Sequence, residues 1–154
     1  MRNIGKRNSV IIAVLAVALI ALAVFTFAAI IPRLDKVDTT RDLSVADYEI
    51  CQLDEKGKKV ESEFGVVSNE IAVDKFDSVT WDEKADVKGY YVYTYNYKHE
   101  FVKASALQKA DLNTLSTDLT TNAKYFRIYI ETTEEVKLLD MGSVIKQVTV
   151  TIAR

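Results

Sequence analysis

Cysteine, histidine and proline each occur only once in this 154-residue chain, and glycine occurs only five times. Because Cys51 has no second cysteine to pair with, the chain has no intrachain disulfide. Zinc sites usually need several cysteine or histidine ligands, and Cys51 and His99 lie far apart in the sequence, so we expect no metal site of this type. The shortage of glycine and proline also argues against fibrous or low-complexity structure.

Charge is unevenly distributed along the chain. Residues 1–9 carry Arg2, Lys6 and Arg7 without any acid, and residues 10–31 carry no charge at all. Since the whole chain has 20 Lys and Arg, the remainder holds 17 basic residues against 22 acidic ones. This remainder has no excess of basic residues that could bind a phosphate backbone, so we expect no nucleic-acid partner.

Residues 10–31 read VIIAVLAVALIALAVFTFAAII, with Thr26 as the only polar side chain. As a helix rising about 1.5 Å per residue, this run spans roughly 33 Å, which is enough for a hydrocarbon core of roughly 30 Å. The upstream charge is all positive, whereas the flank after Pro32 is mixed. The positive-inside rule therefore predicts a single-pass protein with residues 1–9 in the cytoplasm, residues 10–31 in the lipid bilayer, and the remainder outside the cytoplasm.

Two other interpretations of this apolar run stay open. Residues 21–23 (ALA) and 26–28 (TFA) offer the small side chains that a signal peptidase needs, which would make the run a cleaved secretory signal. A pilin-like subunit also begins with an apolar helix, processed here near Gly5. We favour a retained anchor, because the run is longer than the roughly 7–15 apolar residues of a signal peptide.

The exported part begins with residues 32–47, which are polar and alternate in charge sign, and which we predict to be a stalk. In residues 48–67, two short alternating runs flank a polar cluster that contains Gly57, a residue able to adopt the positive φ of a tight turn. We therefore predict a β-hairpin extension, which either joins the main sheet or packs beside it.

Residues 68–154 show the pattern of an all-β domain. Short segments rich in β-branched and aromatic residues alternate with polar turns, and no long amphipathic helix interrupts them. This spacing predicts a two-sheet sandwich. The expected strands are Glu70–Val73, Phe76–Trp81, Tyr90–Tyr97, Glu100–Ala104, Leu112–Leu119, Tyr125–Glu131 and Val144–Ile152.

The segment SVTWDEKADVKGYYVY resembles strands B and C of a fibronectin type III domain, a member of the immunoglobulin-like β-sandwiches. An apolar-x-Trp triplet at Val79 and Trp81 is followed by an apolar-x-Gly-Tyr-x-Val run, VKGYYV, at residues 87–92. Leu119 and Tyr125 are similar in spacing to the tyrosine corner of that family. Either Tyr125 forms this corner, or the strand instead turns Phe126, Ile128 and Ile130 to the core. The resemblance implies a fold and says little about function.

Alternation also predicts which side chains form the core. Side chains two positions apart share one face of a strand, so inward-facing residues on facing strands meet between the two sheets. We expect Trp81 to make the largest single apolar contribution. The predicted structural core is Val79, Trp81, Tyr90, Val92, Leu119 and Tyr125.

Four tyrosines alternate along one predicted strand and form the first candidate binding surface: Tyr91, Tyr93, Tyr95 and Tyr97. They lie on the face opposite Tyr90 and Val92, and tyrosine is enriched at binding interfaces. The alternative is that neighbouring strands or the preceding hairpin cover these rings.

No catalytic constellation is recognisable. His99 is the only histidine, and it lies in a predicted strand end or turn exposed to solvent. The carboxylates of residues 74–86 match no calcium-loop spacing, and Lys84 and Lys88 partly neutralise them. We therefore expect no enzyme activity, no metal and no cofactor.

The sequence predicts a membrane-anchored, extracytoplasmic binding or structural module that makes protein–protein or protein–glycan contacts at the cell surface. The alternative is a pilin-like filament or envelope-complex subunit, whose apolar amino-terminal helix packs against other helices. Neither the identity of the partner nor the oligomeric state follows from the sequence.

Overall fold

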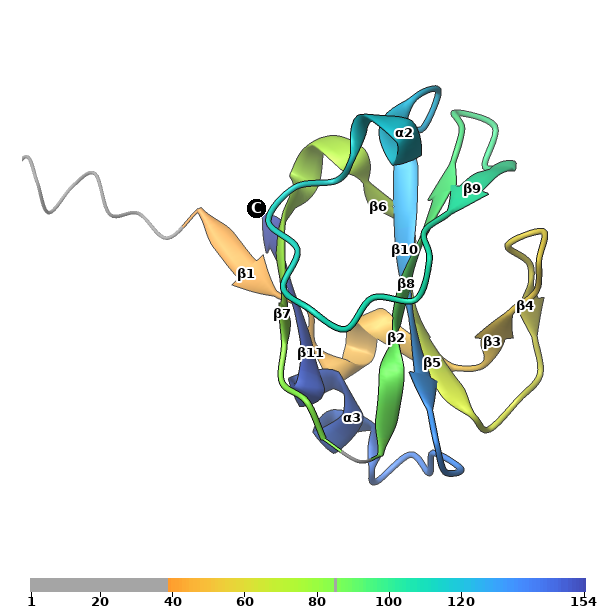
Figure 1. The fold of residues 1–154 in the computed structure, drawn as a ribbon, viewed down its shortest axis with the longest axis vertical. Coiled ribbons are helices and arrows are strands. Elements are labelled where there is room, and N and C mark those ends of the chain that lie inside the picture. Colours follow the sequence, from red (N-terminus) through yellow and green to blue (C-terminus); the bar gives the residue numbers. More distant parts are fainter. Residues whose placement is uncertain (1–38, 85) are drawn as a thin grey trace, which may run out of the picture. The chain divides into compact units, whose positions relative to one another are not determined.

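The computed structural model describes residues 39–84 and 86–154, which form a predominantly β fold (Figure 1). The predicted stub and transmembrane helix, with residues 32–38 of the predicted stalk, lie outside these residues. In chain order the elements are β1 (Thr40–Asp42), η1 (Val45–Asp47), β2 (Tyr48–Ile50), β3 (Gln52–Leu53), β4 (Lys59–Val60), β5 (Gly65–Ser68), β6 (Ile71–Ala72), η2 (Val73–Lys75), β7 (Phe76–Trp81), β8 (Val87–Tyr95), β9 (Phe101–Ala104), α2 (Thr117–Thr120), β10 (Tyr125–Thr132), α3 (Met141–Gln147) and β11 (Val148–Ala153).

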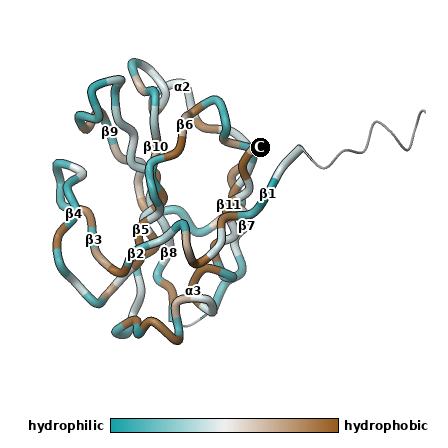
Figure 2. The backbone as a smooth tube through the Cα atoms, turned by 180° about the vertical axis from the view of Figure 1, so that it is seen from behind, coloured by the Kyte–Doolittle hydropathy of each residue, from teal (hydrophilic) through white to brown (hydrophobic). Residues whose placement is uncertain are grey.

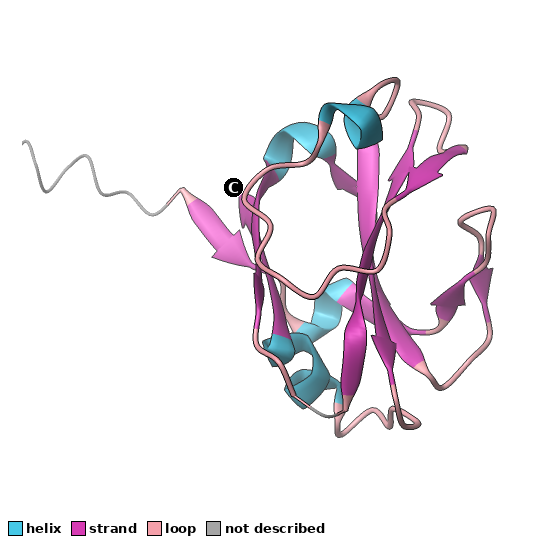
Figure 3. Ribbon diagram, viewed as in Figure 1, coloured by secondary structure: helices cyan, strands magenta, loops and turns pink. Residues whose placement is uncertain are grey.

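The strands form two main antiparallel sheets and a separate hairpin. Sheet A has the strand order β1-β11-β7. Sheet B has the order β2-β5-β10-β8-β9, and β6 also pairs with β10. The remaining pair, β3 and β4, forms a hairpin of its own. Two short helices precede strands: α2 comes before β10 and α3 comes before β11 (Figure 3).

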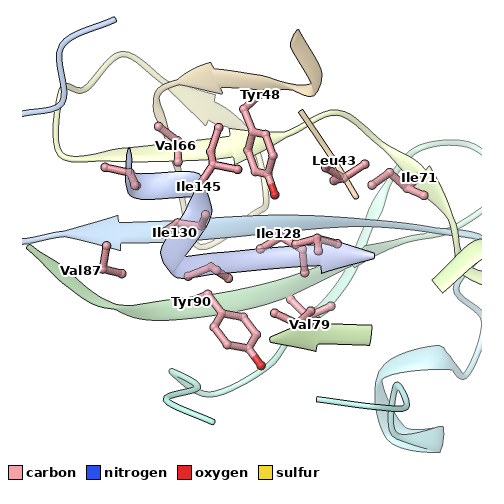
Figure 4. Packing of buried hydrophobic residues seen from close by; sticks show 14 of the residues in the cluster. Leu43, Tyr48, Val66, Ile71, Val79, Val87, Tyr90, Ile128, Ile130 and Ile145 are labelled. Carbon is pink, nitrogen blue, oxygen red and sulfur yellow. The ribbon is translucent and has the colours of Figure 1, made fainter. Parts of the chain in front are cut away.

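A single hydrophobic core joins the two sheets (Figure 4). Sheet A contributes Val79 and Val150, while sheet B contributes Tyr90 and Ile128, and all four side chains are fully buried. From α3, Ile145 covers one end of this core. Burial of this much apolar surface between facing sheets is the main source of stability in such a fold.

The central strand β10 is buried on both of its faces. Phe126, Ile128 and Ile130 face the core between the sheets, and each is fully buried. Tyr129 points to the opposite face, where it belongs to a second hydrophobic cluster. Of the two arrangements that the sequence left open for this strand, the structure therefore has the one in which Phe126, Ile128 and Ile130 face the core.

The last strand has an unexpected neighbour. In an immunoglobulin-type sandwich the final strand lies beside the strand that precedes it in the sequence. Here β11 pairs with β7 in sheet A, and β5 and β6 occupy the edge of β10 that the final strand would take. The reason is α3, which separates β10 from β11 and carries the chain from one sheet to the other.

The folded domain begins earlier than the predicted stalk boundary at residue 47. Strand β1 pairs with β11, with Thr40 opposite Ala153, and the side chain of Leu43 is buried. Arg41 donates hydrogen bonds of 3.0 and 3.3 Å to Asp47, and this interaction lowers the pKa of Asp47 to about 2. Residues 40–47 are therefore part of the domain.

Two predicted strands are partly helical. Within residues 112–119, Leu112 makes only an isolated bridge to Val79, and the segment then enters α2. The Ser116 side chain accepts a hydrogen bond from the Leu119 N–H and so caps that helix. This cap favours a helical turn, although the alternating pattern of the segment favours a strand. The predicted strand Val144–Ile152 likewise begins as the second half of α3.

Candidate functional site

The six predicted core residues divide into two groups. Val79, Tyr90 and Val92 are fully buried, and Leu119 is nearly so. Trp81 and Tyr125 are only half-buried, so Trp81 lies at the border of the core rather than at its centre. The hydroxyl of Tyr90 donates a 2.7 Å hydrogen bond to the Ala110 carbonyl and so fastens the loop after β9 to the core.

Three of the four tyrosines of the candidate binding surface lie on the outer face of sheet B, whereas Tyr97 lies beyond the end of β8, and the structure covers two of the four. Tyr93 is 8% exposed and Tyr95 is 3% exposed, whereas Tyr97 is 69% exposed. Tyr91 is half-buried and stacks on Tyr129 with ring centroids 5.6 Å apart. Tyr93 and Tyr95 therefore cannot meet a partner while this face stays covered.

The cover is the β3–β4 hairpin, which packs beside sheet B and not at its edge. Leu53 and Cys51, within and next to β3, join Tyr93 and Tyr95 in the second hydrophobic cluster. At the turn, Gly57 has a φ of 67°, which confirms the predicted positive φ. A Cβ at this position would lie 2.7 Å from the Phe101 ring, so only glycine lets the turn approach so closely.

One hydrogen bond ties this hairpin to the tyrosine face. The Tyr95 hydroxyl donates to the Gly57 carbonyl over 2.7 Å, and burial raises the pKa of Tyr95. We expect Tyr95→Phe to lower the free energy of unfolding by about 1 kcal/mol, because the buried carbonyl loses its partner. Chemical denaturation followed by circular dichroism measures this loss, and hydrogen exchange at the β3 and β4 amides should become faster.

The matched control is Tyr97→Phe, which removes the same hydroxyl from the exposed end of the tyrosine series. We expect it to change the free energy of unfolding by less than about 0.5 kcal/mol. If both variants lower the free energy of unfolding equally, the bond has no special role in fixing the hairpin. Unchanged hydrogen-exchange rates at the β3 and β4 amides of Tyr95→Phe would contradict that role as well.

A polar cluster missed by sequence reasoning lies at the start of β10. Glu70 accepts a 3.0 Å hydrogen bond from Arg127 and contacts Nδ1 of His99. The imidazole stacks on Tyr125 with ring centroids 4.5 Å apart, and the Arg127 guanidinium lies 5.6 Å from the centroid of the Tyr95 ring. Glu70 precedes β6 and Arg127 lies on β10, so no local sequence pattern connects them.

This cluster holds the turn after β8 in place. His99 has a φ of 61°, and within residues 39–84 and 86–154 its side chain hydrogen-bonds to Glu70 alone. A catalytic triad requires a nucleophile hydrogen-bonded to the imidazole. Within this part of the chain, the hydrogen-bond partners of His99 include no such nucleophile. The same residues contain no group of three or more His, Cys, Asp or Glu placed to hold a metal ion.

The most exposed large apolar side chains of the described domain lie between β10 and α3, in a segment that we call the leucine loop (residues 134–139). Leu138 is 73% exposed and Leu139 is 96% exposed. The loop is nonetheless anchored, because Val136 is buried and its N–H donates to the Glu63 carbonyl over 2.6 Å. Figure 2 shows the hydrophobic colouring of this segment at the end of the domain where α3 lies.

A groove of 750 Å³ opens beside the leucine loop. One wall comes from the chain between β4 and β5, and the other comes from the loop itself. Its lining combines apolar and acidic side chains with one serine and one lysine. The lining residues are Ile50, Glu61, Ser62, Glu63, Glu135, Val136, Lys137 and Leu138.

Comparison of the chain with family models, curated proteins and solved structures found no match. Among residues 39–84 and 86–154, no helix combines the length and the hydrophobicity that a bilayer crossing requires. The predicted membrane span at residues 10–31 lies outside this part of the chain.

Proposed function

We propose that this chain is a single-pass membrane protein that displays a fibronectin type III-like binding domain outside the cytoplasm. Residues 10–31 serve as the anchor, residues 1–9 stay in the cytoplasm, and the domain contacts another protein through the leucine loop. The immunoglobulin-like assignment is supported by two antiparallel sheets that share one core, with Val79, Tyr90 and Val92 inside it. The pairing of β11 with β7 departs from the usual strand order of that family.

The observation that carries the proposal is the exposure of Leu138 and Leu139, at 73% and 96%. Two adjacent leucines in water cost free energy that burial against a partner would recover, at about 25 cal/mol per Å² of apolar surface. Thr40, where the predicted stalk joins the domain, pairs with Ala153 at one end of β11, whereas the leucine loop and α3 precede the other end. The loop therefore lies away from the attachment point.

The location is tested with a reporter enzyme that is active only outside the cytoplasm, fused after Arg154 of the full chain. We expect reporter activity and recovery of the chain in the membrane fraction. Changing Arg2, Lys6 and Arg7 to glutamate should reduce the activity, because the positive-inside signal is removed. An inactive reporter on a chain recovered from the soluble cytosol would refute the proposed placement.

The contact surface is tested by a photo-crosslinking side chain at position 139 of the full chain, with the exposed position 109 as the matched control. We expect a discrete adduct with another protein from position 139 only. Leu138→Ser should abolish it without lowering the unfolding midpoint, because this side chain supports no core. Equal adducts at both positions, or none at 139, would contradict the proposed surface.

The same preparation separates this function from a filament subunit. Light scattering of the detergent-solubilised chain should give a defined particle of one or a few copies. An open-ended distribution of sizes would instead favour an assembly in which the apolar helices pack against one another.

A further inference from the structure

The groove beside the leucine loop has an apolar floor and an acidic rim. Among the lining side chains, Ile50 is half-buried and Val136 is buried, and we call these two the apolar floor. The volume of 750 Å³ lies within the range of roughly 300–1,000 Å³ that is typical of ligand sites. It is sufficient for an apolar side chain together with neighbouring residues of an extended segment.

The carboxylates that line the groove are not engaged in ion pairs within the described part of the chain. Elsewhere in the described domain, Glu49, Glu70 and Glu131 each form an ion pair with a lysine, arginine or histidine, whereas Glu55 and Glu83 are examples of acids outside the groove that form none. The acids that line or adjoin the groove likewise form no ion pair within residues 39–84 and 86–154, so they are available to a cationic ligand. These unpaired acids are Glu61, Glu63, Glu134 and Glu135.

Among the lining residues that the structure describes, Lys137 is the one cation, and it is outnumbered by three carboxylates. Such a surface attracts positive charge and repels negative charge, and ion pairs formed there gain strength as the apolar floor excludes water. The charge therefore disfavours nucleic acids, phosphorylated ligands and anionic lipid surfaces. Leu138 contributes an apolar wall, so a purely polar cation would leave that wall exposed.

We infer that the groove binds a segment of another protein in which lysine or arginine residues flank an apolar side chain. In the bound state the apolar side chain lies on Ile50 and Val136, and the cations pair with Glu61, Glu63 and Glu135. This inference rests on the proposed function, because it specifies the chemistry of the partner that meets the leucine loop.

Three synthetic peptides of equal length serve as probes against the full chain in detergent or lipid nanodiscs. The first has lysines around a central leucine, the second replaces the lysines with glutamates, and the third replaces the leucine with serine. Fluorescence anisotropy measures the Kd of each. We expect the first peptide to bind at least about tenfold more tightly than either of the others, and its binding to weaken as salt concentration rises.

The groove is assigned by paired substitutions. We expect the double variant Glu61→Gln/Glu135→Gln to weaken binding of the lysine–leucine peptide by about tenfold. The control variant Glu55→Gln/Glu83→Gln removes the same charge from exposed carboxylates outside the groove, and should change the Kd less than about twofold. Both pairs replace exposed or rim side chains, and circular dichroism verifies that each variant is folded.

Several results would overturn the inference. Equal binding of the lysine and glutamate peptides, or equal loss in the groove and control variants, excludes charge recognition at this site. Self-association of the full chain that is lost in Glu61→Gln/Glu135→Gln would make a second copy the occupant. If no peptide binds while the adduct from position 139 still forms, the proposed partner chemistry is wrong and the proposed function stands. If that adduct is also absent, the proposed contact surface fails as well.

Discussion

Replacing Phe126 with alanine is expected to lower the free energy of unfolding by about 3–5 kcal/mol. Phe126 lies on the central strand β10, is fully buried, and packs edge-to-face against Phe76 with ring centroids 5.5 Å apart. Both sheets border the site, so neither can collapse into the cavity without losing strand pairing. Since small domains have a total stability of only about 5–15 kcal/mol, chemical denaturation of the full chain in detergent should show a large shift.

The comparison variant is Trp81→Ala. The sequence predicts Trp81 as the largest apolar contribution, but the side chain is half-buried at the end of β7, with its ring 6.2 Å from that of Tyr90. We expect a smaller loss of about 2–3 kcal/mol, because part of the indole already contacts water. A loss for Trp81→Ala as large as that for Phe126→Ala would show that Trp81 is the centre of the core after all.

Gly89→Ala is expected to cost about 2–4 kcal/mol through two separate effects. Gly89 has a φ of 153°, which side chains rarely adopt, and a Cβ there would lie 2.6 Å from the backbone oxygen of Gln108. That oxygen cannot move away easily, because the Tyr90 N–H donates to it over 3.1 Å and the Gln108 N–H donates to the Tyr90 oxygen over 2.8 Å. Thermal unfolding followed by circular dichroism measures the effect.

Gly142→Ala is the matched control for Gly89→Ala. Gly142 lies inside α3, and a Cβ there would make only an ordinary 3.7 Å contact with Val45. We expect stabilisation by about 0.5–1 kcal/mol, because alanine has the higher helix propensity. If both substitutions destabilise the domain equally, then the close approach of residue 108 to β8 is not what requires glycine at position 89.

The positions of several strands could be predicted from alternation. Phe76–Trp81 forms β7 as expected, and the runs after residues 86 and 124 form the two long strands of sheet B. The positive φ of Gly57 was also predicted, since a polar cluster with a single glycine favours a tight turn. These features are local, so the residues that determine them are neighbours in the sequence.

Other features depend on competition between local patterns and distant contacts. Residues 112–119 alternate like a strand, yet Ser116 caps a helical turn in the same stretch. The leucine loop lies outside every predicted strand, and only the tertiary structure shows that Leu138 and Leu139 are in solvent. The cluster of Glu70, His99 and Arg127 likewise requires β6, β8 and β10 to meet.

The sequence by itself determined the uncharged run at residues 10–31, the antiparallel β character of the domain and the division of β8 into two side-chain faces. Tertiary structure decided which of those faces meets water. Alternation distinguishes two faces but does not say what covers either one. For β8 the cover comes from the β3–β4 hairpin, whose Gly57 lies 38 positions before Tyr95. The tyrosine face therefore forms a second hydrophobic cluster, and the most exposed leucines of the described domain lie in the leucine loop.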